Sequence, residues 1–203
     1  MKKWTEIPDQ KIIDKTIAAL KVNGIDAFFV ENREEAKRKV LELIPKGAEV
    51  MTMTSVTLDS IGIPKEINES GNYDSVRNKL NSMDRKTQGR KMQALGASPE
   101  WTLGSVHAVT QDGKILVASN TGSQLSAYVY GSDHVIWVIG AQKIVKDFDM
   151  AMTRLYEHTL PLESERLKKI YGVPSNVSKL LIINKEVKPG RITAVIVKEV
   201  LGF

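Results

Sequence analysis

Alternating stretches of apolar and polar positions predict a succession of helices and strands in the N-terminal part of the chain. Ile13, Ile17 and Leu20 recur at the spacing of one helix face, and Asp9 precedes them at the position of a helix cap. A short apolar strand, a second amphipathic helix capped by Asn32 and another strand follow. Strands that alternate with helices favour a parallel sheet with helices on both faces. The predicted elements are a helix over 9–23, a buried strand over 27–30, a helix over 32–44 and a strand over 49–54.

The segment from Leu103 to Val145 contains three runs that are rich in β-forming residues. The first two flank Asp112-Gly113, a pair that supplies the positive φ of a tight hairpin. The third run is almost entirely apolar, as in a strand that is buried on both faces of a sheet. Before it, a polar loop at 119–124 leads into a segment, 125–130, that we expect to begin a helix. The three strands are predicted at 106–110, 114–118 and 134–139.

The remaining pattern predicts three further helices and two closing strands. The helices are expected at 76–95, 147–158 and 161–171, and the strands at 179–184 and 191–197. No repeat, low-complexity tract or linker interrupts the chain, so we predict a single domain over residues 1–203. Its expected fold class is α/β, with a three-layer α/β/α arrangement around a mostly parallel sheet.

Composition narrows the classes of protein to which the chain can belong. Hydrophobic residues make up 42% and charged residues 26% of the 203 residues, as in an ordinary globular domain. The absence of cysteine excludes disulfides, thiolate metal sites, iron–sulfur ligation and cysteine catalysis. No apolar stretch approaches the length of a membrane span, and the first residues lack the apolar segment of a secretion signal. We therefore expect a cytoplasmic protein with no membrane partner.

The positive charge of the chain is concentrated in one segment. The net charge is +5, and the residues from Arg77 to Lys91 include six basic side chains but only one acid, Asp84. Three interpretations remain open at this point: a solvated helix face, a site for an anionic ligand, or a nucleic-acid surface. No aromatic residues interleave with the basic ones, which argues against a surface for single-stranded RNA.

Hydroxyl-rich loops follow two of the predicted strands. Ser55 and Thr57 come after the strand at 49–54, and the second loop follows the hairpin. Backbone N–H groups at a helix start favour an anion, although either loop could equally be a helix cap and turn. If both loops face one crevice, the anion site becomes the stronger interpretation. The candidate ligand-binding residues of the second loop are Asn120, Thr121, Gly122, Ser123 and Gln124.

Three single residues are further candidates. Lys143 follows the apolar strand, where it could reach a phosphate or carboxylate, and Arg191 follows Pro-Gly and could point to the same crevice. His107 could act as a general base near pH 7 or could be a hydrogen-bonded strand residue. The three histidines have no ligand spacing to one another or to a carboxylate, so no metal site is predicted.

These segments, in their order and spacing, resemble the LUD-domain family (lactate utilisation, YkgG/LutC type). The resemblance implies a NagB/RpiA/CoA-transferase-like fold with its ligand crevice at strand ends, and it adds Gly104 to the candidate ligand-binding residues. The sequence also departs from the family pattern at one position, because Val106 stands where the family pattern has an Asp. The matching segments are 55–62, 104–122, 135–145 and 189–203.

Three hypotheses about function follow. The first is a protein that binds a small anionic metabolite or has an accessory role in organic-acid (lactate-type) utilisation, with no cofactor. The second is an isomerase or acyl-transferase-like enzyme of the same superfamily, with His107 as its base. The third, a nucleic-acid partner for the basic segment, has the least support from composition. The superfamily likeness also implies a possible homodimer.

Overall fold

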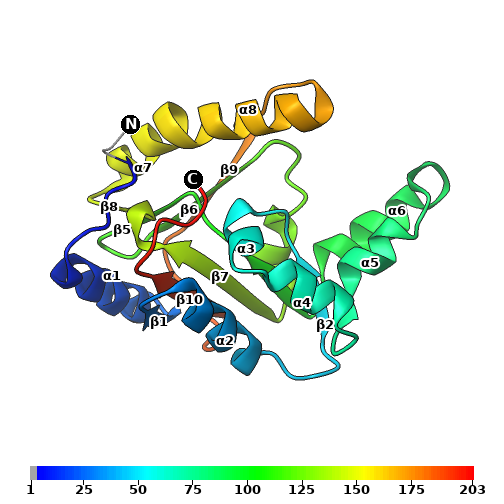
Figure 1. Cartoon of the computed structure of the whole chain (residues 1–203), viewed down its shortest axis with the longest axis horizontal. Helices are drawn as coiled ribbons and strands as arrows, with labels where there is room; N and C mark the ends of the chain where they lie inside the picture. The colour runs from blue at the N-terminus through cyan, green and yellow to red at the C-terminus, as the bar shows by residue number, and fades with distance from the viewer. Residues whose placement is uncertain (1–3) are drawn as a thin grey trace.

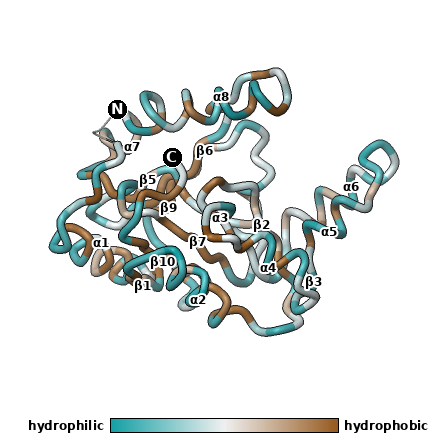
Figure 2. The backbone as a smooth tube through the Cα atoms, viewed as in Figure 1, coloured by the Kyte–Doolittle hydropathy of each residue, from teal (hydrophilic) through white to brown (hydrophobic). Residues whose placement is uncertain are grey.

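A parallel six-stranded sheet lies at the centre of the computed structural model, which describes residues 4–203 (Figure 1). Its order is β1-β10-β7-β4-β2-β3, and all neighbouring strands run parallel. The apolar run that opens at His134 forms β7 in the middle of this sheet, brown in Figure 2, and is buried beyond that residue. The predicted α/β class is thus confirmed. The strands are β1 (Asp26–Val30), β2 (Glu49–Thr52), β3 (Asp74–Ser75), β4 (Trp101–Gly104), β7 (His134–Gly140) and β10 (Ile192–Val197).

Helices cover both faces of the sheet, because successive residues of a buried strand point to opposite sides. Ile136 and Val138 of β7 pack in a core with α2 (Arg33–Leu43), α3 (Val56–Ser60) and α4 (Ile63–Glu69). The intervening residues of β7, Val135 and Trp137 among them, pack in a second core with α1 (Gln10–Val22). Asn32 caps α2 as predicted, because its side chain accepts a hydrogen bond from the backbone N–H of Glu35.

A second sheet of four strands lies beside the α1 core. It contains the predicted hairpin, and Val109 and Ile115 of that hairpin join the α1 core while Ala108 and Leu116 face a third core. This third core includes residues of α7 (Phe148–Arg154), so the second sheet forms an additional layer that the sequence pattern did not indicate. The strands, in the order β8-β5-β6-β9, are β8 (Ile144–Val145), β5 (Ala108–Thr110), β6 (Ile115–Ser119) and β9 (Lys179–Ile183).

The predicted helix over 76–95 is wrong in one respect, because two helices occupy that segment. These are α5 (Val76–Asn81) and α6 (Arg85–Ala97). Asp84 between them caps α6, with its side chain accepting hydrogen bonds from the backbone N–H of Lys86 and the hydroxyl of Thr87. None of the residues of α6 is buried, and Figure 1 shows the α5–α6 pair extending from one side of the molecule.

The two helices predicted at 147–158 and 161–171 are in fact one continuous helical segment. It consists of α7 (Phe148–Arg154), the π-helical turn η4 (Leu155–Thr159) and α8 (Leu160–Tyr171). Proline cannot donate a helical hydrogen bond, and here the π-turn directly precedes the turn that contains Pro161. None of the helices within residues 4–203 combines the length and apolar composition needed to cross a membrane.

The strand predicted at 27–30 exists, but it is not a buried one. As β1 it forms one edge of the six-stranded sheet, and Ala27 is the only buried residue of its five. Phe28 is 36% exposed, and its ring lies under the ammonium group of Lys39. The apolar run was misleading because a sheet edge can carry aromatic residues that cationic side chains cover.

Candidate functional site

A cleft of about 1190 Å³ lies at the carboxyl ends of three neighbouring strands, β2, β4 and β7. Loops that follow these strands contribute Ser55 and Thr57, Ser105 to His107, and Lys143 to its lining. The loop after β6 adds a further wall, and residues of α8 and of the α5–α6 pair line the cleft as well. Carboxyl ends of parallel strands are where α/β folds usually bind ligands.

Both hydroxyl-rich loops face this one cleft. Of the eleven candidate residues, all line it except Gly104 and Arg191. Ser55 also caps α3, because its hydroxyl accepts a hydrogen bond from the backbone N–H of Leu58 at 3.4 Å. The candidates that line the cleft are Ser55, Thr57, His107, Asn120, Thr121, Gly122, Ser123, Gln124 and Lys143.

Hydrogen bonds within the loop over 119–124 engage two of the backbone amides that we expected to be free. The N–H of Gly122 donates to the Ser119 hydroxyl at 2.8 Å, and the N–H of Ser123 is directed at the Thr121 hydroxyl at 3.3 Å. Ser119 in turn bonds the side chain of Gln124 at 3.0 Å. The loop is therefore held by its own hydrogen bonds, and it contributes polar side chains to the wall of the cleft.

Lys143 forms the floor of the cleft, directly after β7 in the short 3-10 turn η3 (Ala141–Lys143), and is only 2% exposed. Its Nζ lies 3.0 Å from the hydroxyl of Thr57, 3.1 Å from that of Ser105 and 3.1 Å from the carbonyl of Val106. Thr57 donates its own proton to the Leu201 carbonyl, and Ser105 donates to the Val138 carbonyl. All three neighbours of Nζ therefore act as acceptors, which matches the three N–H groups of an ammonium ion.

No carboxylate in the described part of the chain pairs with this ammonium group. Burial lowers the pKa of Lys143 well below its ordinary value, and the charge of Arg154 lowers it further, whereas the three acceptors favour the charged form. The floor of the cleft is thus a desolvated basic group that lacks a carboxylate partner among the described residues.

His107 lies beside Lys143 and is held as a neutral hydrogen-bond donor. Its Nδ1 accepts the backbone N–H of Ala118 at 3.1 Å, so the ring proton is on Nε2. Burial, followed by the charges of Lys143 and Arg154, lowers the pKa of His107 to about 3. Among the described residues Nε2 has no hydrogen-bond partner, and the ring lines the cleft. This geometry suits donation to a ligand oxygen and gives little support to the general-base role.

Arg154 adds a third basic group beneath these two, and sequence reasoning missed it. Its guanidinium is fully buried and donates through one nitrogen to the carbonyl of His107 and to the hydroxyl of Thr159. The other two nitrogens have no hydrogen-bond partner within the described residues. Burial lowers the pKa of Arg154 to about 10. It stands at the start of the π-turn η4, an irregularity that is frequent at functional sites.

The lining of the cleft is strongly cationic. Among the described residues it includes five basic side chains and one acidic side chain, Glu163, a formal side-chain charge of +4. Glu163 is bound by Arg166 through two contacts of 2.7 Å. The other three cationic side chains are arginines of the basic segment, which thus contributes to the wall of the cleft. They are Arg77, Arg85 and Arg90.

The residues before the end of the chain close one side of the floor. Thr57 and the side-chain amide of Gln142 both donate to the Leu201 carbonyl. Gly202 has a φ of +63°, and a β-carbon there would lie 2.4 Å from the Thr57 hydroxyl and 3.5 Å from Nζ of Lys143. Glycine is therefore required at this position for both backbone and packing reasons.

We expect Gly202→Ala to lower the free energy of unfolding by about 2–3 kcal/mol, since it combines a strained backbone with a steric clash against Thr57. Gly172→Ala is the matched control, because Gly172 has a φ of +74° but nothing within 4 Å of its added β-carbon. That control should cost only about 1 kcal/mol. Urea titrations of both variants measure the difference, and equal losses would contradict a clash at the floor.

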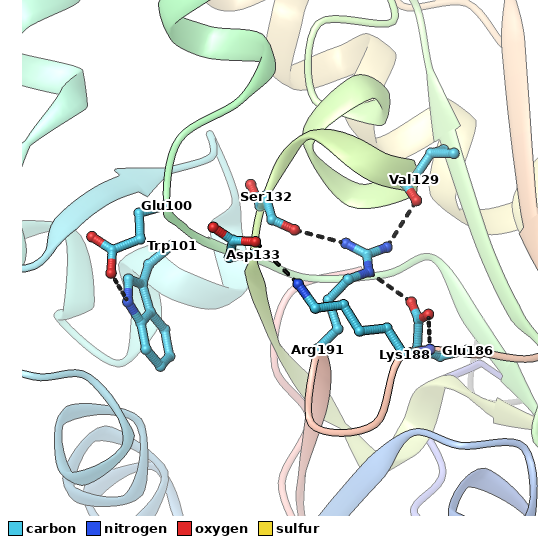
Figure 3. A network of polar contacts seen from close by, with 8 residues as sticks. All are labelled: Glu100, Trp101, Val129, Ser132, Asp133, Glu186, Lys188 and Arg191. Carbon is cyan, nitrogen blue, oxygen red and sulfur yellow. Dashed lines mark hydrogen bonds and ion pairs between the residues drawn. The ribbon is translucent and has the colours of Figure 1, made fainter.

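Arg191 has a structural role at the amino ends of the strands, on the side of the sheet opposite the cleft (Figure 3). Its guanidinium pairs with Glu186 at 2.7 Å, and the exposed fractions of the two side chains are 7% and 9%. It also donates to the carbonyls of Tyr128, Val129 and Ser132, at the end of the π-turn η2 (Ala127–Gly131). Because Arg191 precedes a parallel strand, it lies at the amino edge, away from the cleft.

Gly104 lies behind the cleft and is buried. A β-carbon at this position would fall 1.8 Å from the hydroxyl oxygen of Tyr128. The glycine is thus needed for the close packing of the Tyr128 ring, which also meets Trp137 edge-on with ring centroids 5.4 Å apart. This contact accounts for the residue without any ligand.

Comparison with known proteins identifies the family. The model of the LUD domain family matches residues 13–202, which is nearly the whole chain. The chain belongs to the LUD domain family. Among curated proteins, no sequence matches it.

A solved structure supports the fold of this LUD domain. A DUF162 family protein from Deinococcus radiodurans superposes with a TM-score of 0.59 over 95% of this chain and 99% of that protein, at 11% sequence identity. At such low identity the likeness concerns the fold alone. The eIF2B beta subunit from Chaetomium thermophilum is more distant, with a TM-score of 0.32, 16% identity and coverage of 68% of this chain and 44% of the other.

Proposed function

We propose that this LUD domain binds a small anionic metabolite in the cleft, with the negatively charged group of the ligand against Lys143 and His107. The main support is that Lys143 is a buried cation with no carboxylate partner among the described residues. An unpaired buried charge is costly to the fold, and such groups are concentrated at functional sites. A ligand anion would supply the missing negative charge, and it would accept a hydrogen bond from Nε2 of His107.

The low local dielectric constant at the floor strengthens the attraction between the ligand anion and these basic groups, since water is largely excluded from Lys143 and Arg154. The resemblance to lactate-utilisation proteins provides the metabolic context. We therefore infer an accessory or binding role in organic-acid utilisation in the cytoplasm, with a hydroxy or oxo acid such as lactate as the ligand class.

Lys143→Met should weaken the binding of lactate or a related carboxylate by at least about 10-fold, because it removes the charge at the floor. Lys146→Met is the matched control, since Lys146 is exposed and does not line the cleft. Isothermal titration and thermal-shift assays with lactate, pyruvate and inorganic phosphate measure the change. Binding should raise the free energy of unfolding by about 2.7 kcal/mol at 100 times the dissociation constant.

The stability of Lys143→Met separates a binding role from a structural one. Removing a buried charge that faces Arg154 should leave the free energy of unfolding unchanged or raise it. A loss of about 3–5 kcal/mol would instead indicate a structural cation. If no anion stabilises the wild-type protein at millimolar concentration, the proposed function is refuted.

An isomerase or acyl-transferase function has less support. A proton-transfer mechanism needs a free base, but Nδ1 of His107 is occupied by the backbone of Ala118. Glu163, the only acidic side chain in the described lining, is held by Arg166. The floor could polarise a carbonyl group, yet neither His107 nor Glu163 is free to remove a proton beside it.

A further inference from the structure

The cleft has a second cationic region, separate from its floor. Arg85 and Arg90 line it from α6, and both side chains are exposed. In contrast to Arg166, neither forms an ion pair with a carboxylate in the part of the chain that the structure describes. The floor and this arginine pair therefore present two separate places for negative charge within one cavity.

The helix that carries the arginine pair is held against the body of the protein at its C-terminal end. A β-carbon on Gly131 would lie 1.9 Å from the carbonyl oxygen of Ala97, so the end of α6 packs directly on η2. The α5–α6 pair (residues 76–97) forms an arm, and at its base Arg77 of α5 donates to the carbonyl of Thr52 at 2.5 Å and 3.2 Å. The position of α6 beside the cleft is thus fixed by contacts at both ends of the arm.

The size of the cleft indicates a ligand larger than a three-carbon acid. Pockets for ligands of drug or nucleotide size are roughly 300–1,000 Å³, and this cavity measures about 1190 Å³. A lactate ion at Lys143 would fill only a small part of it and would leave the arginine pair without a partner. The remaining space and charge call for a ligand that extends from the floor toward α6.

We propose that the ligand is a phosphate ester of about nucleotide size, with its phosphate groups on Arg85 and Arg90 and a carboxylate or carbonyl end at the floor. Planar guanidinium groups bind phosphate oxygens in pairs and remain charged at all relevant pH values. The inference rests on the proposed function, because it extends the ligand from the floor to the arm. It differs in assigning a second binding site, for phosphate, to the basic segment.

The chain offers a matched pair of double variants for the test. Arg85→Gln/Arg90→Gln removes two cations that line the cleft, whereas Lys86→Gln/Lys91→Gln removes two exposed cations of the same helix that do not. The probes are inorganic pyrophosphate, ADP and lactate, each titrated calorimetrically into the full chain. We expect the arginine variant to weaken pyrophosphate and ADP by at least about 10-fold, with lactate and the lysine variant changed less than about 2-fold.

The outcomes separate this inference from the proposed function. If lactate binds and depends on Lys143 but pyrophosphate and ADP do not bind at millimolar concentration, the phosphate site is refuted and the floor remains. If pyrophosphate and ADP bind through the arginine pair but no carboxylate responds to Lys143→Met, the floor hypothesis fails instead. Equal losses in the arginine and lysine variants would also overturn the inference, because they indicate diffuse attraction of the kind a nucleic-acid surface shows.

Discussion

Replacing Arg191 with Met is expected to lower the free energy of unfolding by about 3–5 kcal/mol. The substitution leaves the carboxylate of Glu186 buried without its partner at 2.7 Å. It also removes the donor that three carbonyl groups at the end of η2 share. Each carbonyl that stays buried and unbonded adds its own desolvation cost. The loss should therefore exceed that of an ordinary surface ion pair.

The neighbouring ion pair of Lys188 and Asp133 provides the control (Figure 3). Their atoms lie 3.1 Å apart, but the side chains are 60% and 69% exposed. Lys188→Met should therefore change the free energy of unfolding by no more than about 1 kcal/mol. Chemical denaturation followed by circular dichroism measures both variants. Similar small effects at the two positions would show that the ion pair and hydrogen bonds of Arg191 are not a major source of stability.

A ligand titration provides a second measurement, because a residue with a purely structural role should not affect ligand affinity when it is replaced. Arg191 lies at the amino edge of the sheet, so a folded Arg191→Lys variant should bind lactate or ADP with unchanged affinity. A variant that keeps its stability but loses ligand affinity would restore Arg191 to the binding site.

The misplacement of Arg191 shows what the sequence could and could not indicate. The local pattern predicted the strand that follows Arg191. Only the topology of the sheet decides whether Arg191 lies on the side of the cleft or on the opposite side. A residue that precedes a parallel strand lies opposite the residues that follow its neighbours. Ser55, Thr57 and Lys143 all follow strands, and their common position at one edge could be predicted for that reason.

The second sheet lay beyond sequence reasoning for a different cause. The hairpin at Asp112-Gly113 was predictable because its turn has a specific backbone requirement, and Gly113 has a φ of +82°. Its strands have the same apolar character as those of the central sheet, and no local signal assigns a strand to one sheet or the other. The pairing of β6 with β9 joins residues that lie far apart in the chain.

The chemistry of the floor depended on contacts that only the fold creates. His107 was a candidate base because an isolated histidine titrates near neutral pH. The fold gives its Nδ1 the backbone N–H of Ala118 and surrounds the ring with Lys143 and Arg154. Arg154 carried no signal of its own, since a single arginine in a helix is ordinarily a surface residue. Its burial follows from the π-turn and the packing of α7 on the second sheet.

His107 should make the protein sensitive to acid. The pKa of its ring is about 3 in the folded state, against 6.5 for an unperturbed histidine. Between these values the unfolded chain binds a proton that the folded protein does not, so the free energy of unfolding falls as the pH is lowered. The loss of stability due to His107 is absent above pH 6.5 and grows toward pH 3, where it should lower the free energy of unfolding by on the order of 4 kcal/mol.

His107→Asn tests this prediction, because an asparagine oxygen can accept the N–H of Ala118 but does not titrate. The wild-type protein and the variant should differ by no more than about 1–2 kcal/mol at pH 7. On acidification the wild type should lose stability faster, and the difference between the two curves cancels the shared contribution of the carboxylates. Urea titrations at a series of pH values give both curves, and the ring resonances of His107 should show no protonation above about pH 4. Parallel curves, or a ring that titrates near pH 6.5, would mean that His107 is solvated and free to act as a base, which would reopen the enzymatic hypothesis.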